Sequence, residues 1–213
     1  MLRVRFMRPL AAACLLLHVA GARADDLATA LADLQQRWAV ANYELRDKPR
    51  VAALDVLTED AESLTRQYPQ RAEAWIWCGI IRSTLAGARG GLGALGIAKA
   101  ARRDLEQAIA LDPTALDGSA YTSLGTLYHK VPGWPVGFGD DDKAEQLLRK
   151  ALELNPNGID ANYFYGEFAL DQGHRAEAAQ YLTRASAAPP RPGRELADRG
   201  RQQEIAALLA KAK

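Results

Sequence analysis

Hydrophobic residues recur along this chain at helical spacing, and no stretch alternates apolar and polar residues long enough to indicate a strand. In residues 26–46, for example, Leu27, Leu31, Leu34 and Trp38 fall on one helical face. Prolines at 49, 69, 113 and 156 are expected to separate helices, because the residue before a proline is biased away from the helical conformation. The pattern predicts an all-α chain with helices over residues 26–46, 51–68, 72–86, 97–111, 118–130, 142–154, 159–172, 175–187 and 194–211.

A motif of small residues, one leucine and a proline occurs three times, with successive spacings of four, three and five residues. Its members are Ala101, Leu105, Ala108 and Pro113, then Ala144, Leu148, Ala151 and Pro156, then Ala178, Leu182, Ala185 and Pro190. Residues four and three apart share one helical face, and small side chains on that face let a partner helix approach closely. Three copies of one motif predict a helical repeat architecture.

Together with Gly79, Gly125 and Gly166 in the preceding helices, this motif resembles the tetratricopeptide repeat, a helix–turn–helix unit. The resemblance covers about residues 72–190, with Trp75 in the first repeat and Tyr121, Leu124 and Tyr128 in the second; Asn162 stands where an aromatic residue is usual. It implies an α-solenoid of antiparallel helix hairpins, a TPR-like superhelix with a C-terminal capping helix. Its single domain, residues 25–213, divides into a degenerate repeat (25–69), repeats one to three (72–113, 118–156 and 159–190) and the capping helix (194–211).

Residues 1–24 have the features of a secretory signal peptide. Arg3, Arg5 and Arg8 precede an apolar run from residue 10 to 20, and Ala22 and Ala24 form a small-x-small cleavage site. Lipidation at Cys14 is the alternative. Removal of four signal arginines would change the net charge from +1 to −3, which argues against nucleic-acid binding. We expect a periplasmic protein without a membrane-spanning segment after cleavage.

Two insertions separate paired helices, at residues 87–96 and 131–139. The first contains a G-x-G-x-x-G run but follows a helix rather than a strand, so nucleotide binding is not expected. The second contains Trp134 and Phe138, whose rings either pack onto the hairpin or contact a partner. Asp142 and Glu145 predict a capping box at the start of the next helix.

The resemblance implies that the first helix of each repeat lines a concave groove. The positions so placed are Glu73, Ile76, Ile80 and Ser83, then Ser119, Thr122, Thr126 and His129, then Asp160, Tyr163, Glu167 and Leu170. None is Lys, Arg or Asn, so the lysine/asparagine clamp of chaperone-tail binders is absent from these positions, and the groove would suit an uncharged or basic segment. The candidate binding residues are Ile76, Ile80, Thr122, Thr126, His129, Tyr163 and Glu167, with Trp134 and Phe138 in the insertion.

No arrangement typical of catalysis, metal binding or a cofactor is found, and His129 has no evident carboxylate partner in the sequence. Cys78 is expected to be a buried small hydrophobe. Arginines 191, 194, 199 and 201 are expected to pair with the neighbouring acids Glu195, Asp198 and Glu204. The function predicted is non-catalytic binding of a protein or peptide partner. The alternative is a small-molecule-binding accessory of a solute transport system, because exported T-components of TRAP transporters are similar in outline.

Overall fold

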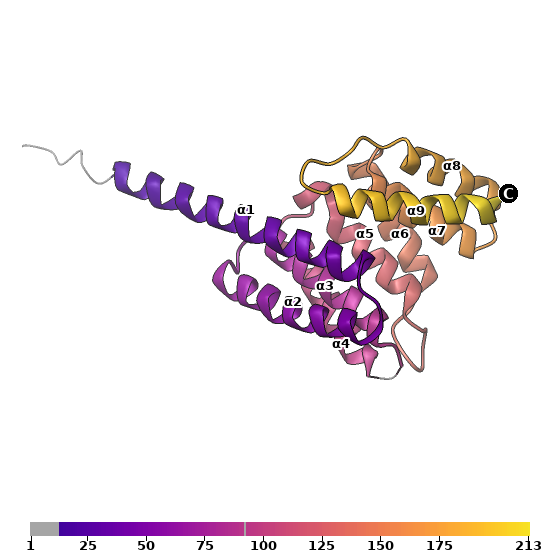
Figure 1. Ribbon diagram of the computed structural model, residues 1–213, viewed down its shortest axis with the longest axis horizontal. Coiled ribbons are helices and arrows are strands. Elements are labelled where there is room, and N and C mark those ends of the chain that lie inside the picture. Colours follow the sequence, from indigo (N-terminus) through magenta and orange to yellow (C-terminus); the bar gives the residue numbers. More distant parts are fainter. Residues whose placement is uncertain (1–12, 92) are drawn as a thin grey trace, which may run out of the picture.

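The computed structural model describes residues 13–91 and 93–213, with side chains from residue 26 onward (Figure 1). Expectations about residues 1–12, including Arg3, Arg5 and Arg8, lie outside the described residues. The part described contains nine helices and no strand, only an isolated bridge between Gly133 and Gly139. The helices are α1 (Ala13–Tyr43), α2 (Asp47–Gln67), α3 (Ala72–Arg89), α4 (Ala94–Leu111), α5 (Ala115–Lys130), α6 (Asp141–Leu154), α7 (Ile159–Asp171), α8 (Arg175–Ser186) and α9 (Glu195–Ala212). The predicted all-α superhelix of sequential hairpins is confirmed.

The first helix begins inside the expected signal segment. Helix α1 runs without a break from Ala13 to Tyr43, and Figure 1 shows its first half projecting from the body of the molecule. Its second half packs on the body through Leu27, Leu31, Leu34 and Trp38, as the hydrophobic pattern predicts. None of the described helices combines the length and the apolar character needed to cross a membrane.

The repeated motif forms the same helix crossing three times. A Cβ atom added to Gly79 of α3 would lie 2.6 Å from Cγ of Leu105 in α4. The equivalent distances are 2.8 Å from Gly125 of α5 to Leu148 of α6 and 2.8 Å from Gly166 of α7 to Leu182 of α8. The missing side chain therefore lets each hairpin close, and the leucine of the motif fills the space.

Three clusters of buried side chains follow one another along the stack. The first joins α1, α2 and α3, the second joins α3, α4 and α5 with Leu147 of α6, and the third joins helices α6 to α9. Cys78 is buried in the first cluster, as expected, and its burial raises the pKa of its thiol. Each repeat thus packs mainly on its neighbours, which is the arrangement of a solenoid.

Several predicted boundaries were wrong, each for a local reason. Pro49 was expected to lie outside a helix, but α2 already begins at Asp47. Proline is tolerated in the first helical turn, where its missing N–H would have no intrahelical partner. The predicted capping box at Asp142 is also wrong: the N-cap is Asp140, whose side chain accepts a hydrogen bond from the Lys143 N–H at 3.0 Å.

Much of the first insertion is helical. Helix α3 extends to Arg89 and α4 begins at Ala94, so the expected ten-residue loop becomes a short turn between two longer helices. By contrast, the second insertion is a true loop, in which Gly139 N–H donates to the Pro132 carbonyl and Gly137 N–H to the Gly133 carbonyl, both at 3.0 Å. It rests against α4, since the Arg102 guanidinium lies 4.7 Å from the centre of the Phe138 ring.

The capping helix α9 contacts both ends of the described stack. Ile205, which is 1% exposed, packs into the third cluster, while Ala197 packs into the first. Gly200 of α9 lies directly against the Tyr43 ring at the end of α1, where an added Cβ atom would come within 2.2 Å of Cδ1. Figure 1 shows α9 lying alongside α1 and α8. The superhelix therefore closes on itself where α9 meets α1, and its concave side forms a partly open cavity.

Candidate functional site

A cavity of about 980 Å³ fills the concave side of the superhelix. Eight of the twelve predicted groove positions line it, from the first helices of all three repeats, and five of these are candidate binding residues: Ile80, Thr122, Thr126, Tyr163 and Glu167. Ile76 was predicted beside them, but it is fully buried in the second cluster and does not line the cavity. Its placement differs because α3 packs against α5 at this turn.

His129 also lies away from the cavity lining, and it has the carboxylate partners that the sequence did not reveal. Its Nδ1 is 2.8 Å from Asp141 of α6, and its Nε2 is 3.0 Å from Asp171 of α7. The hydrogen bond with His129 lowers the pKa of Asp141. Its ring meets Phe168 edge-on, with the ring centres 5.1 Å apart. His129 therefore joins three helices rather than facing a ligand.

The two aromatic residues of the second insertion separate. Phe138 packs edge-on against Tyr128, with ring centres 5.5 Å apart, and forms part of the second cluster. Trp134 is 91% exposed at the tip of the same loop. Neither residue lines the cavity. The interpretation that both rings pack onto the hairpin is thus correct for Phe138 and wrong for Trp134.

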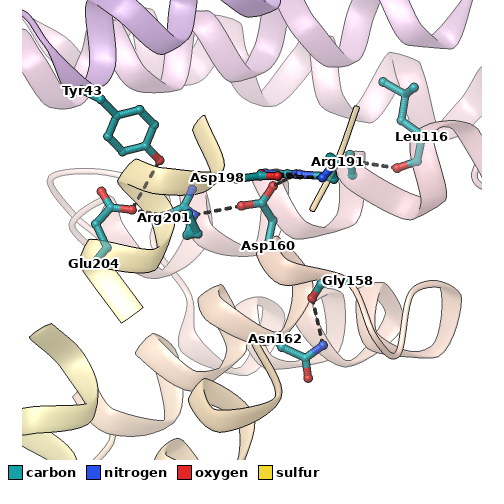
Figure 2. A network of polar contacts seen from close by, with 10 residues as sticks. Tyr43, Leu116, Gly158, Asp160, Asn162, Arg191, Asp198, Arg201 and Glu204 are labelled. Atoms are coloured by element: carbon teal, nitrogen blue, oxygen red, sulfur yellow. Dashed lines mark hydrogen bonds and ion pairs between the residues drawn. The ribbon is translucent and has the colours of Figure 1, made fainter. Parts of the chain in front are cut away.

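The far wall of the cavity is built by α9 and the linker before it, which contribute arginines (Figure 2). Arg201 of α9 is 8% exposed and lies over the rings of Tyr163 and Phe164, at 4.1 and 4.5 Å. Its Nη1 donates to Glu204 at 2.7 Å, and the Tyr43 hydroxyl donates to the same carboxylate at 3.4 Å. Burial raises the pKa of Tyr43 to about 12.

Asp160, the first acidic residue of α7, holds this wall in place. One of its oxygens accepts from Arg191 at 2.6 Å and the other from Arg201 at 2.9 Å. Burial alone would raise the pKa of Asp160, but Arg201 and Arg191 outweigh it and hold that pKa at about 2. The carboxylate is therefore ionised at neutral pH, and it fastens both linker and capping helix to the third repeat.

Asn162 fixes the turn that presents Asp160. Its side chain is fully buried and donates to the carbonyls of Pro156 and Gly158, both at 2.9 Å. Figure 2 shows it below Asp160, with its amide directed at Gly158. A polar residue at a position where the repeat family usually has an aromatic one thus anchors the start of α7.

Sequence reasoning missed most of the charged lining. Pairing of the terminal arginines within their own segment was expected, and it holds for Arg191 with Asp198 and for Arg201 with Glu204. However, both arginines also reach Asp160 in another helix. The prediction of a weakly acidic groove was wrong because it counted only first helices, while Arg50, Arg191, Arg194 and Arg201 come from elsewhere. In the sequence, only the proline-rich linker before α9 could have indicated that this segment returns to the cavity.

Residues 137–212 match the family model described as Tetratricopeptide repeat. Among solved structures, the chain is similar to TTC0263, a thermophilic TPR protein in Thermus thermophilus, with 23% identity, a TM-score of 0.53, and coverage of 76% of this chain and 82% of that one. It is also similar to the MamA protein, with 18% identity, a TM-score of 0.45, and coverage of 88% and 91%. No curated protein sequence matches the chain. The likeness to the Thermus protein shows the fold.

Proposed function

We propose that this tetratricopeptide-repeat protein is a non-catalytic scaffold that binds an extended segment of a partner protein in its concave cavity. Repeats of this kind typically serve as protein-interaction scaffolds. One observation carries the proposal: equivalent positions of three successive first helices, Ile80, Thr126 and Glu167, which each follow the crossing glycine, line one continuous cavity. Its volume of about 980 Å³ is at the upper end of the range for ligand pockets, about 300–1,000 Å³, and suits a few residues of extended chain.

The test is a peptide-library selection on the purified chain, with a variant that fills the cavity. Thr126→Trp places a large ring on a half-buried lining position, and Lys99→Trp places the same ring on an exposed position of α4 outside the cavity. We expect selected peptides to bind the parent chain and Lys99→Trp equally, and to lose binding to Thr126→Trp. Peptides that bind Thr126→Trp as well as the parent chain would contradict the proposal.

A second candidate is a small-molecule-binding accessory of a solute transport system. The observation that favours it is the contact of α9 with α1, which narrows the opening of the cavity. In that case a metabolite, rather than a peptide, would raise the thermal unfolding temperature, and Thr126→Trp would abolish the increase.

We also propose export to the periplasm, supported by the signal-like residues 1–24. Mass spectrometry of the protein from the cell envelope should find a chain that starts at Asp25. A chain that retains residues 1–24, or one lipidated at Cys14, would contradict this cleavage.

A further inference from the structure

Large apolar side chains that remain exposed gather at two places outside the cavity. Among the side chains that the structure describes, five are of this kind: Val40, Val56, Leu116, Trp134 and Val136. Leu116 lines the cavity, whereas the other four do not. Trp134 and Val136 lie together in the α5–α6 loop, and Val40 and Val56 line a groove between α1 and α2. Apolar groups that gather on a surface, unlike scattered ones, mark interaction sites.

The α1–α2 groove is hollow and almost entirely apolar. It has a volume of about 500 Å³ and is lined by Gln36, Arg37, Val40, Ala41, Leu45, Ala53, Val56 and Leu57. Val40 and Val56 stay 39% and 53% exposed, since α2 packs only on α1 and α3 among the described helices. The third repeat, by contrast, is covered by α9. A terminal repeat that lacks a polar outer face offers an apolar surface to another chain.

The α5–α6 loop presents Trp134 as a projecting group on a fixed base. Trp134 is 91% exposed, and Val136 beside it is 54% exposed. The base is held because the Gly139 N–H donates to the Pro132 carbonyl at 3.0 Å and Phe138 packs into the second cluster. A large ring on such a base loses little conformational freedom on binding, so most of the free energy from its burial contributes to affinity.

We propose that the Trp134 loop of one molecule docks into the α1–α2 groove of a second copy of this chain. The chain carries both surfaces, one projecting and one hollow, and within one molecule Trp134 lies outside the groove lining. A second copy covers both surfaces with a single contact, whereas any other partner would cover only one of them. The contact is head-to-tail, so a molecule at each end keeps a free loop or a free groove. The inference goes beyond the proposed function, because neither surface lines the cavity.

The two surfaces predict a weak association that salt does not disrupt. Arg37 is the only charged residue among the described groove-lining residues, and it already pairs with Asp33 and Asp60 at 2.9 and 2.7 Å. Apolar burial rather than charge would therefore drive the contact. One aromatic side chain buries about 150–250 Å², whereas a stable interface buries about 1,200–2,000 Å² in total. The association should therefore be reversible and should depend on protein concentration.

Sedimentation equilibrium of the purified chain, from micromolar to millimolar concentration, tests the inference. We expect the mean mass to rise with concentration, to the same extent at low and at high salt. Trp134→Ser removes the projecting ring, and Val56→Glu places a charge in the groove; each should weaken the association at least about tenfold. Ser63→Glu is the matched control, because it adds the same charge at an exposed position of α2, about two helical turns away and outside the groove. It should associate like the parent chain.

A mixture of the two variants distinguishes this contact from others. Trp134→Ser keeps an intact groove and Val56→Glu keeps an intact loop, so the mixture should form heterodimers with the affinity of the parent chain, and nothing larger. Val40→Glu, on the α1 side of the groove, should replace Val56→Glu in this experiment with the same result. Recovery in the mixture also shows that both variants fold.

Several results would overturn the inference. They are a parent chain that stays monomeric at every concentration, association that persists in Trp134→Ser, and mixtures that stay monomeric with both groove variants. Association through two grooves would be lost in Val56→Glu but kept in Trp134→Ser, and would also overturn it. A monomeric parent chain that sediments with phosphatidylglycerol vesicles, and no longer does so as Trp134→Ser, would assign the loop to a membrane surface instead.

Discussion

The helix crossings of this protein use the same residues in every repeat, whereas the cavity wall uses different ones. At the crossings, three repeats use the same residues in the same contact, a glycine against a leucine at 2.6 to 2.8 Å from the missing Cβ. In the wall, the corresponding positions differ: Ile80 in the first repeat, Thr126 in the second and Glu167 in the third, with arginines added from α2, the linker and α9. Repeated contacts hold the solenoid together, and the residues that do not repeat give the cavity its chemistry.

The largest loss of stability is expected from removal of the Asp160 carboxylate. Asp160→Ala leaves Arg191 and Arg201 without their shared carboxylate, and Arg201 is 8% exposed. We expect the free energy of unfolding in urea to fall by about 2–4 kcal/mol, below the range for a fully buried pair because the Asp160 side chain is one-third exposed. Glu59→Ala, at an exposed position of α2 without an ion pair among the described residues, should change it by less than about 0.5 kcal/mol. Equal effects of the two substitutions would show that the network does not hold the wall.

The Asp160 carboxylate should also make the free energy of unfolding depend on pH. The folded-state pKa of Asp160, about 2, lies below its ordinary value of 3.8, so ionised Asp160 stabilises the fold above about pH 4. That contribution is lost as pH falls from 4 through 2. The difference in unfolding free energy between the parent chain and Asp160→Asn should therefore narrow over this interval and stay constant from pH 5 to 7. A difference that is independent of pH would contradict the ion-pair assignment.

A crossing glycine can be compared with another glycine of the same helix. Gly79→Ala would place a Cβ atom 2.6 Å from Leu105, whereas Gly87→Ala meets nothing within 4 Å. Overpacking costs about 1–3 kcal/mol and alanine gains up to about 1 kcal/mol of helix propensity. We expect Gly79→Ala to lower the unfolding free energy by about 1–2 kcal/mol and Gly87→Ala to raise it slightly, as measured by urea unfolding. A stabilising Gly79→Ala would show that the hairpin can open without cost.

The same contrast explains what could be predicted from the sequence. Periodic signals gave the hairpins, because Gly166, Ala178 and Leu182 meet within one short segment. The return of α9 to α1 carries no periodic signal: Tyr43 and Glu204 are 161 residues apart and meet only because the superhelix curves. Three of the lining arginines, Arg191, Arg194 and Arg201, depend on that return. The cavity was therefore predictable where first helices face inward, and unpredictable where the capping segment closes it.

The smallest change in the free energy of unfolding is expected from substitution of Arg194, which forms no ion pair among the described residues. Arg194→Gln removes a cation–π contact with Trp77 worth about 0.5–1 kcal/mol, but also removes the cost of a half-buried charge that Asp160 and Asp198 attract without forming an ion pair with it. We expect the unfolding free energy to change by less than about 0.5 kcal/mol, whereas Arg201→Gln should lower it by several times as much, because Asp160 and Glu204 both lose a partner. Urea unfolding of both variants provides the measurement. If Arg194→Gln destabilises the protein as strongly as Arg201→Gln, then Arg194 belongs to the structural network of the wall. If the difference holds, Arg194 can be changed without loss of the fold.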